Sequence, residues 1–371
     1  MVVKHTQMPI YMDVHTVPGV KAMDVAEAHH KDLFHQNEYG CKCMTYWVDE
    51  QRESIFCLIE APEKDAVEKL HRKAHGLIPG KIIEVNKTLV ESFLGRIYDP
   101  EEITIADNGL KVFSDSSFRI LLVTKTTDPV LLQHKMGIEK ANTLLSEHNT
   151  TIRRNIAQYG GREVEQESNG FVVSFTSASK TVACALNTQK EMQHAADIGF
   201  KTSINAGDPV EKSNTIFGDT IRLATNLCMI ANSGKILLGS AVKDIVSKDM
   251  LQGDTKHFFS LSPSDESLFL LLFNKLEENW QDADFDITRY CYAVAMSTSQ
   301  LYRKTISLTG LSPNALLKQY RLEKAKELMK KQGYSIAQIT FESGFTSASY
   351  FTKCFKKEYG LLPMAYLDLL Y

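Results

Sequence analysis

Four histidines in the first 75 residues have the side chain and the spacing that transition-metal sites in proteins use. His71 and His75 are four residues apart, so in a helix both project from the same side, and an imidazole pair at that spacing can share one metal ion. His15 is expected at the end of a strand, with Asp13 on its own face, and His29 is expected midway along a helix. Imidazole suits Ni, Cu, Zn and Fe alike, so the ligand type does not choose the metal. A set of solvated surface histidines is the alternative that the spacing leaves open.

A second group of residues, near the end of the chain, has the pattern of a DNA-reading helix. The segment 335–360 is predicted to form a short helix, a turn at Gly344 and a second helix. Phe351, Cys354 and Phe355 repeat at helical spacing and are expected to pack on the first helix. The opposite face of the second helix carries small or basic side chains: Ala348, Ser349, Thr352, Lys353 and Lys356. Two helices joined through a glycine turn, with a basic and polar outer face, predict a helix-turn-helix.

The same pattern occurs earlier, from Ile287 to Gly310, which predicts a reader with two parts. A third helix is expected between the copies, with Ser312 as its N-cap and Pro313 in its first turn. A helical connector of about 20 residues spans about 30 Å. Successive major-groove segments on one face of DNA are about 34 Å apart. The spacing therefore favours two recognition helices that enter neighbouring major-groove segments.

The distribution of charge points to the same partner. The whole chain has a formal net charge of −3. From Phe285 to Tyr371, however, Lys and Arg outnumber Asp and Glu about two to one, and the rest of the chain is acidic. A basic domain on an acidic body indicates a polyanion partner for that domain alone, here double-stranded DNA.

The length and composition of the chain limit the classes of protein to which it can belong. A chain of 371 residues is long enough for two to four domains with separate cores. The longest apolar run, 268–273, is far too short to span a bilayer, and the first residues lack the apolar centre of a signal peptide. The seven cysteines include no CxxC pair. Reduced thiols in a cytoplasm, and no membrane partner, are therefore expected.

Three domains are predicted, over residues 8–96, 117–246 and 262–371. The first is expected to alternate strand, helix, strand, strand, helix, strand, which is the ferredoxin-like βαββαβ order. Its helices are expected at 22–36 and 63–75, and its last strand at 81–93. The second domain is predicted as an α/β sandwich. It begins with a buried strand and a long helical stretch to Tyr159, followed by a hairpin that turns at 168–170. The third is all-helical, so the fold class is α+β multidomain.

The phrases YMDVH, DVAEAHHKDL, YGCKCMTYWVDE and IFCLIEAPEKDAVEKLHRKAHG resemble a small bacterial family of nickel-responsive, nickel-binding proteins of ferredoxin-like fold. The resemblance covers nearly the whole first domain. It implies that some of His15, His29, His71 and His75 bind a transition metal ion, nickel in that family, often across a dimer. Whether Asp13 or Cys57 joins them is left open.

The phrases YGGREVEQESNGFVVSF, FKTSINAGDPVEKSNTIFGDTIRLATNL and ANSGKILLGSAV resemble the catalytic domain of class III nucleotidyl cyclases. Such cyclases hold two metal ions with two aspartates, and the corresponding positions here are Thr124 and Asn169. The base-reading lysine position holds Glu165. Arg222 and Asn226 fall on the positions that stabilise the transition state. A neutral Thr and Asn cannot replace two carboxylates, so a non-catalytic relative is expected that senses a nucleotide or holds a dimer.

The bipartite layout, with RLEKAKELM and GFTSASYFTKCFKKEYGLLPMAYL, resembles the AraC/XylS family of transcription regulators. The resemblance implies that base-reading positions fall on Ser299, Tyr302, Arg303, Ala348, Ser349, Thr352 and Lys353. Arg303 could pair with guanine through two hydrogen bonds, whereas Lys356 is expected to contact phosphate. Thr305 occupies a position that is usually apolar, so the first unit is expected to be less tightly packed.

These expectations combine into one hypothesis. The chain is expected to be a cytoplasmic, homodimeric, metal-responsive transcription regulator of AraC/XylS type, not an enzyme, in which the central module passes on the metal signal or holds the dimer. Two alternatives stay open. One is an active nucleotidyl cyclase regulated by its flanking domains, and the other is a metal-buffering protein with a vestigial DNA-binding domain.

Overall fold

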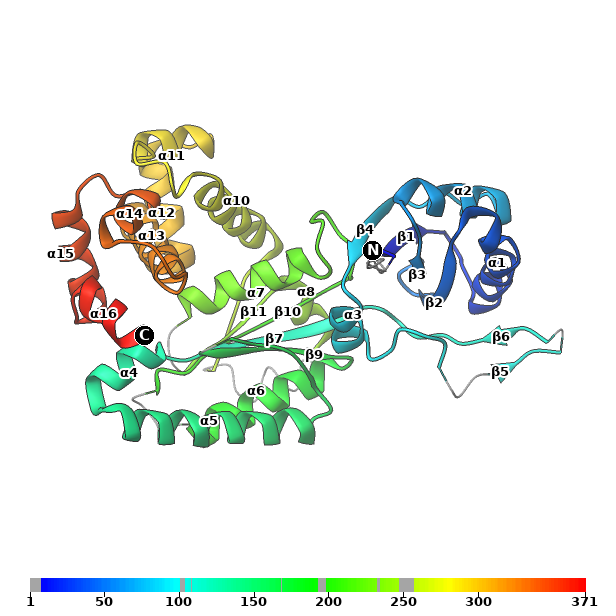
Figure 1. Cartoon of the computed structure of the whole chain (residues 1–371), viewed down its shortest axis with the longest axis horizontal. Helices are drawn as coiled ribbons and strands as arrows, with labels where there is room; N and C mark the ends of the chain where they lie inside the picture. Colours follow the sequence, from blue (N-terminus) through cyan, green and yellow to red (C-terminus); the bar gives the residue numbers. More distant parts are fainter. Residues whose placement is uncertain are drawn as a thin grey trace, which may run out of the picture.

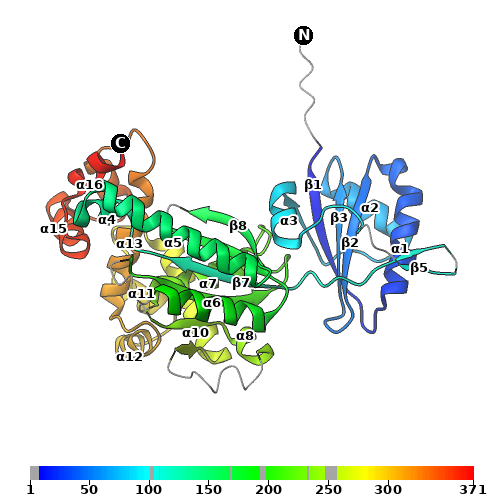
Figure 2. The same ribbon diagram turned by 90° about the horizontal axis from the view of Figure 1, so that it is seen from below.

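The computed structural model describes residues 8–100, 104–107, 109–167, 169–192, 198–231, 234–246 and 257–371, which form three domains in a row (Figure 1). The N-terminal domain lies at one end, the central sheet domain in the middle and the helical C-terminal domain at the other end. A view turned by 90° shows the same order (Figure 2). The predicted α+β class is confirmed.

The N-terminal domain has the predicted ferredoxin-like topology. Its elements are β1 (Ile10–Thr16), α1 (Ala22–His35), η1 (Gln36–Tyr39), β2 (Lys42–Asp49), β3 (Ser54–Glu60), α2 (Lys64–Ala74) and β4 (Lys81–Val85). The strands form an antiparallel sheet in the order β2-β3-β1-β4. One face of this sheet is covered by α1 and α2, through a core that includes Val25, Val67 and Leu70.

The last predicted strand of this domain is too long. The strand ends at Val85, and α3 (Lys87–Leu94) follows it directly. Asn86 explains the change, because its side chain accepts hydrogen bonds from the backbone N–H of Thr88 (2.9 Å) and Leu89 (3.3 Å) and so caps a helix. Beyond α3 the chain forms a short hairpin, β5 (Thr104–Ile105) and β6 (Lys111–Val112), before it enters the central domain.

The second face of the N-terminal sheet is buried against α3 and the central domain. Met12 and Trp47 belong to one apolar core with Phe93 of α3 and with Leu121 and Phe217 of the central domain. Met12 and Trp47 have no exposed surface. The first two domains are therefore joined by a shared core as well as by the chain.

The central domain is a mixed sheet with helices on both faces. Its elements are β7 (Arg119–Lys125), α4 (Pro129–Met136), α5 (Ile138–Gln158), β8 (Arg162–Glu167), β9 (Gly170–Phe175), α6 (Ala178–Met192), β10 (Lys201–Gly207), α7 (Gly218–Ile230), β11 (Ile236–Leu238), α8 (Ser240–Ile245) and β12 (Phe258–Ser260). The strand order is β12-β11-β10-β7-β9-β8. Helices α5 and α6 cover one face and α7 the other (Figures 1 and 2). The predicted long helix is divided into α4 and α5 at Gly137, whose φ of +88° interrupts helical geometry.

The C-terminal domain contains the two predicted helix-turn-helix units. It consists of α10 (Pro263–Asn279), α11 (Ile287–Ala293), α12 (Thr298–Thr309), α13 (Pro313–Met329), α14 (Ile336–Glu342), α15 (Ala348–Tyr359) and α16 (Pro363–Leu370). Helices α11 and α12 form the first unit, α14 and α15 the second, and α13 connects them. Each second helix starts at a serine N-cap, Ser297 or Ser347, and stops at a left-handed glycine, Gly310 or Gly360.

Among the contacts that attach the C-terminal domain to the central domain in the described part of the chain, two are extensive. In the first, Phe269 and Leu272 of α10 share a core with Leu223 and Leu227 of α7. In the second, a buried polar group joins α4 to α13 and α16. Asp128 caps α4, accepts a hydrogen bond from the Tyr366 hydroxyl (2.8 Å) and lies 3.4 Å from the Lys326 Nζ. The sequence did not predict this group.

The turn of the second unit packs against the end of α10. Arg321 of α13 donates to the carbonyl oxygens of Trp280 (2.9 Å), Asp282 (2.6 Å) and Phe285 (3.2 Å). Gly344, with a φ of +77°, lies directly on this group. Arg321 and Gly344 thus hold both units to one helix, α10.

Replacing Gly344 by Ala is expected to destabilise the C-terminal domain strongly. The new Cβ would overlap the Trp280 carbonyl oxygen and would strain a left-handed residue, at a cost of roughly 3 kcal/mol or more. Gly360→Ala is the matched control, because Gly360 has a φ of +83° but no atom within 4 Å of the new Cβ. Thermal unfolding followed by circular dichroism measures both variants, and equal losses would contradict the packing argument.

Candidate nucleic-acid interface and metal centre

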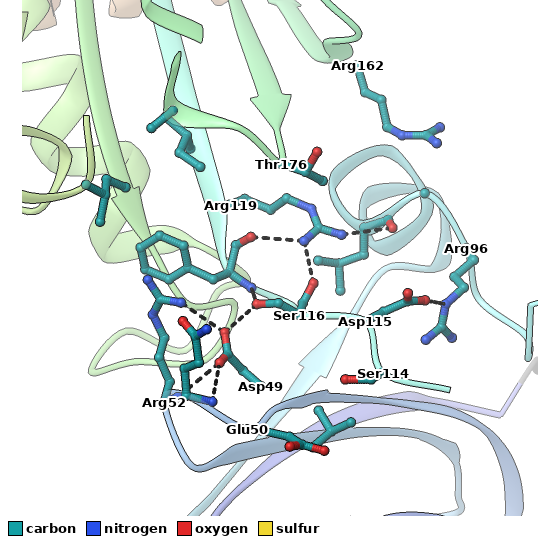
Figure 3. A pocket seen from close by; sticks show the side chains of 18 residues that line it. Asp49, Glu50, Arg52, Arg96, Ser114, Asp115, Ser116, Arg119, Arg162 and Thr176 are labelled. Carbon is teal, nitrogen blue, oxygen red and sulfur yellow. Dashed lines mark hydrogen bonds and ion pairs between the residues drawn. The ribbon is translucent and has the colours of Figure 1, made fainter. Parts of the chain in front are cut away.

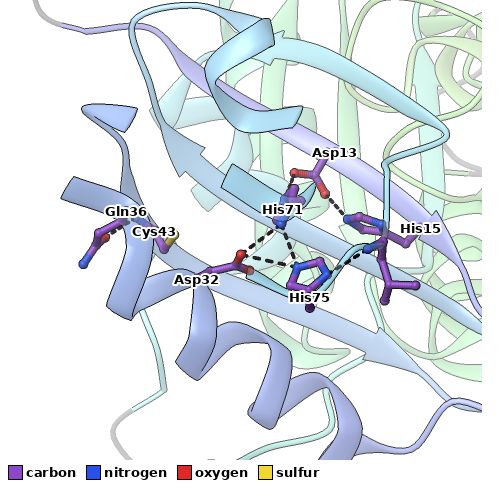
Figure 4. Close-up of polar contacts among 8 residues, drawn as sticks. Asp13, His15, Asp32, Gln36, Cys43, His71 and His75 are labelled. Carbon is purple, nitrogen blue, oxygen red and sulfur yellow. Dashed lines mark hydrogen bonds and ion pairs between the residues drawn. The ribbon is translucent and has the colours of Figure 1, made fainter. Parts of the chain in front are cut away.

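The N-terminal domain gathers carboxylates and imidazoles from three elements into one buried cluster (Figure 4). Asp13 and His15 come from β1, Asp32 from α1 and His71 from α2, and His75 follows the last turn of α2. Asp13, Asp32 and His71 are at most 2% exposed. Charged groups this deeply buried need partners of opposite charge or a bound cation.

His71 is the centre of the cluster. Its Nε2 lies 3.0 Å from Asp13 Oδ2, and its Nδ1 lies 3.2 Å from Asp32 Oδ1 and 2.9 Å from His75 Nε2. His75 Nε2 also lies 3.3 Å from Asp32 Oδ1, and His15 Nε2 lies 3.2 Å from Asp13 Oδ1. The ligand atoms form two overlapping sets, each within 4.8 Å: Asp13, His15, Cys57 and His71, and Asp32, His71 and His75.

The electrostatics of the cluster favour charged groups. Burial alone would raise the pKa of Asp13, but His71 and His15 outweigh it and hold this pKa far below its usual value. Burial alone would lower the pKa of His71, but Asp13 and Asp32 outweigh it and raise this pKa to about 10. The two carboxylates thus stay ionised and hold one positive charge between them. A metal ion that replaced the His71 proton would neutralise the same carboxylates.

Unsatisfied atoms in the cluster also fit a metal ion. His15 Nδ1 is buried without a hydrogen-bond partner in the described part of the chain, whereas His15 Nε2 and Asp13 Oδ1 contact only each other, at 3.2 Å. Such atoms are rare in folded proteins because they are costly. Imidazole and carboxylate donors suit Ni, Cu and Zn. The residues therefore fit a transition metal ion, which would take up lone pairs that the protein leaves unused.

The structure brings together three of the four predicted histidines. His29 lies elsewhere, with its ring 5.2 Å from the ring of Tyr46, and it belongs to neither ligand set. Asp32 is the member that sequence reasoning missed. It follows His29 by three residues on the buried face of α1, and a carboxylate at such a position could have been noticed. Cys57 is in reach, but burial and Asp13 raise its pKa well above its ordinary value.

The central domain places neutral side chains where the cyclase resemblance requires two carboxylates. Thr124 is buried, and its hydroxyl has no hydrogen-bond partner in the described ranges. The Asn169 carboxamide donates to the Thr126 carbonyl oxygen (3.0 Å). Arg222 pairs with Asp219 (2.6 Å). Neither Thr124 nor Asn169 can supply the charge that two divalent ions demand.

The C-terminal domain covers this part of the central domain. A cavity of about 320 Å³ has Asn169 and Asn226 on one side and Lys324 of α13 on another. A second cavity of about 560 Å³ has Arg222 and Asn226 on one side and Phe273 of α10 on another. Of the positions that the cyclase resemblance singles out, Asn169, Arg222 and Asn226 therefore face helices of the same chain.

The predicted base-reading residues lie on the outer faces of α12 and α15. Leu301 and Phe351 anchor the inner faces with no exposed surface. Tyr302 is half-buried, and its hydroxyl accepts a hydrogen bond from the Asn314 side chain (3.0 Å). Thr352 is also half-buried, and the other predicted positions are exposed: Ser299, Arg303, Ala348, Ser349, Lys353 and Lys356. Side chains of these types on exposed helix faces can reach base edges and phosphates.

Thr305 places a polar side chain in the core of the first unit, as the sequence indicated. Thr305 is fully buried, and its hydroxyl has no hydrogen-bond partner among the residues that the structure describes. The second unit has Phe355 at the equivalent position, eight residues after its serine cap, and this ring contacts Phe351, Tyr359 and Tyr366. The core of the second unit is therefore the better filled.

Comparison with known families agrees with these two sites. Residues 290–368 match the family described as "Helix-turn-helix domain", and residues 11–85 match the family described as "Nickel responsive protein SCO4226-like". The C-terminal segment is an AraC-type helix-turn-helix domain, and the N-terminal segment is a SCO4226-like domain. Among described residues, no helix is long and apolar enough to cross a membrane.

Individual proteins resemble single segments of the chain. The HTH-type transcriptional regulator MtrA of Neisseria gonorrhoeae is 35% identical over 95 residues, which are 26% of this chain and 30% of that protein. The structure of SCO4226 from Streptomyces coelicolor is 31% identical and covers 20% of this chain and 94% of its own (TM-score 0.20). The guanylyl cyclase Cya2 is 17% identical over 35% of this chain and 79% of its own (TM-score 0.31). The chain spans 36% or less of the curated relatives that it matches.

Metal titration separates the clustered histidines from His29. His75→Ala removes a ligand at the edge of the cluster and is expected to weaken Ni²⁺ binding by about tenfold or more, as losses at metal sites do. His29→Ala is expected to leave the affinity unchanged, because its ring lies against Tyr46. Isothermal titration calorimetry with Ni²⁺ measures both. A loss in the His29 variant that equals the loss in the His75 variant would contradict this assignment.

Proposed function

We propose that the chain is a sequence-specific DNA-binding transcription regulator of AraC/XylS type whose activity responds to a transition metal ion, nickel first, bound at the N-terminal cluster. The observation that carries the proposal is the buried Asp13–His71–Asp32 group in the same chain as two exposed recognition helices. The match to a nickel-responsive family supports the choice of metal. DNA binding would place the protein in the cytoplasm.

In this proposal the central domain transmits the signal. It shares a core with the N-terminal sheet through Met12 and Phe217, and a second core with α10 through Leu227 and Phe269. A metal ion can shift the DNA-binding equilibrium only if it binds two arrangements of these domains with different affinity. The two arrangements would differ in the packed contacts on both sides of the central domain.

Catalysis by the central domain is the weaker candidate. The Thr124 and Asn169 side chains lack the needed charge, and α10 and α13 lie over the positions that correspond to the cyclase centre. Incubation with ATP or GTP and Mn²⁺, followed by a search for cyclic product, tests it directly. Clear turnover would overturn the non-enzymatic assignment.

Pairing of two central domains is also disfavoured on this face, because the chain's own helices cover it. A homodimer is therefore proposed through other surfaces, and sedimentation of the full chain with and without Ni²⁺ tests it.

A metal-buffering role, the other alternative, predicts that the chain binds Ni²⁺ and that Ni²⁺ has no effect on DNA binding.

Substitutions on the recognition helices are expected to separate sequence reading from phosphate contact. Arg303→Ala should lower the affinity for the specific site by about 1–3 kcal/mol and relax the sequence preference. Lys356→Ala should weaken specific and scrambled DNA alike and lower the salt slope by about one. Fluorescence anisotropy with DNA upstream of the protein's own gene measures both. Lys140→Ala, an exposed lysine on α5, is the control. Unchanged binding by the Arg303 variant would favour a vestigial domain.

The buried group at α4 provides a test of signal transmission. Lys326→Met removes the cation that Asp128 faces, and breaking a buried pair costs roughly 3–5 kcal/mol. The variant should bind Ni²⁺ as the natural protein does, but the change in DNA affinity on adding Ni²⁺ should shrink. Lys331→Met, at an exposed lysine, is the control. A metal effect of full size in the Lys326 variant would show that this contact does not transmit the signal.

A further inference from the structure

A cavity of about 920 Å³ lies between the N-terminal and central domains, away from the metal cluster and the recognition helices (Figure 3). Its walls come from three parts of the chain. The turn between β2 and β3 contributes Asp49 and Arg52, the segment after α3 contributes Gly95 and Arg96, and the central domain contributes Arg119, Arg162 and the start of α6. A ligand in this cavity would touch both domains at once.

Four arginines line the cavity, and two of them have carboxylate partners. Arg52 pairs with Asp49 (2.9 Å), and Arg96 pairs with Asp115 (3.1 Å). These two pairs neutralise themselves, and the third lining carboxylate, Glu50, pairs with Lys21 (3.1 Å), so the remaining charge of the cavity comes from the other two arginines.

Arg119 is a buried cation held by carbonyl oxygens alone. It is 6% exposed and donates to the carbonyl oxygens of Phe93 (3.1 Å), Leu94 (3.1 Å), Ser116 (2.6 Å) and Phe118 (3.0 Å). No carboxylate contacts it in the described ranges. Burial, partly offset by Asp115 and reinforced by Arg162 and Arg96, lowers its pKa to about 10. The floor of the cavity therefore carries positive charge that no contacting carboxylate cancels.

Arg162 adds a second uncancelled charge at the mouth. Among described residues it has neither a hydrogen-bond nor an ion-pair partner, and it is exposed. Its guanidinium lies over Gly95, where an added Cβ would come within 2.9 Å of its Cζ. Gly95 follows Leu94, whose carbonyl oxygen Arg119 binds, so both guanidiniums converge on the end of α3. Figure 3 shows the Arg162 side chain without a dashed contact.

The remaining lining suits an anion with several oxygen atoms. Thr176 offers a hydroxyl, and α6 begins at Ala178, so the positive end of a 15-residue helix faces the cavity. A planar guanidinium binds a phosphate group through two parallel, charge-assisted hydrogen bonds. The volume exceeds that of a single phosphate, so the remainder of a small organic molecule has room.

We propose that this cavity is a binding site for a small phosphate-bearing ligand, held by Arg162 at the mouth and attracted by the buried Arg119. Because the walls come from two domains, the ligand stabilises the arrangement in which they are packed together. The site is separate from the metal cluster, and the proposal does not depend on the proposed regulator function.

Binding of inorganic phosphate and of AMP to the full chain at constant ionic strength tests the proposal. Calorimetry is expected to show saturable binding to the natural protein, weakened tenfold or more in Arg162→Gln and less in Arg162→Lys, which keeps the charge without the planar fork. Arg154→Gln is the control, because Arg154 is an exposed arginine paired with Glu191 outside the cavity and should leave binding unchanged. Arg162 is exposed, so the variants should unfold at the same temperature as the natural protein when no ligand is added.

Three results would overturn the proposal. The first is the absence of saturable binding of either probe. The second is equal binding by the natural protein and the Arg162→Gln variant. The third is tighter binding of citrate than of phosphate and AMP at the same ionic strength, which would assign the cavity to a carboxylate ligand instead.

Discussion

The alternation of side chains along β1 is the constraint on which the rest of the structure depends. Successive residues of a strand point to opposite faces of the sheet. Asp13 and His15 therefore enter the polar cluster under α2, whereas Met12 and Val14, which alternate with them, face the core that the N-terminal sheet shares with α3 and the central domain. A change in the charge or geometry of the cluster acts on the strand that also places Ile10 and Met12 in this shared core. The proposed metal site and the first interdomain contact therefore lie on the two faces of one strand.

Beyond this strand, further packed contacts join the N-terminal, central and C-terminal domains. Arg119 binds the last carbonyl oxygens of α3, which fixes the N-terminal domain to the first strand of the central sheet. The α7 helix joins that sheet to α10, and the Asp128–Lys326–Tyr366 group joins it to the second helix-turn-helix unit. Interdomain interfaces that are apolar and extensive resist independent domain motion. The central domain thus contacts the SCO4226-like domain on one side and the helix-turn-helix domain on the other.

The sequence predicted what local spacing encodes. The second recognition helix followed from apolar periodicity, a glycine turn and a basic outer face, the first from a repeat of the same pattern, and the ferredoxin-like order from alternating strands and helices. The i, i+4 spacing of His71 and His75 predicted that both rings lie on one side of a helix. It gave no information on His29, whose ring lies beside the ring of Tyr46. Asp32 was missed because a carboxylate on an apolar helix face has no partner within reach along the sequence. Asp128 and Lys326 are separated by 198 residues, and only tertiary packing brings such a pair together. The apolar pattern predicted a continuous helix through Gly137 and a continuous strand through Asn86. The helix break at Gly137 and the helix cap at Asn86 are both encoded locally, but the apolar pattern does not include them.

The central claim is that metal at the N-terminal cluster changes how the C-terminal domain binds DNA. The most direct measurement is the affinity of the full chain for DNA upstream of its own gene, with and without saturating Ni²⁺, at fixed ionic strength. The account predicts a change of about fivefold or more, the scale of ordinary allosteric coupling, and predicts that it disappears when Asp13 and His71 are both replaced. An affinity that is the same with and without Ni²⁺, in a protein shown to have bound the metal, would contradict it.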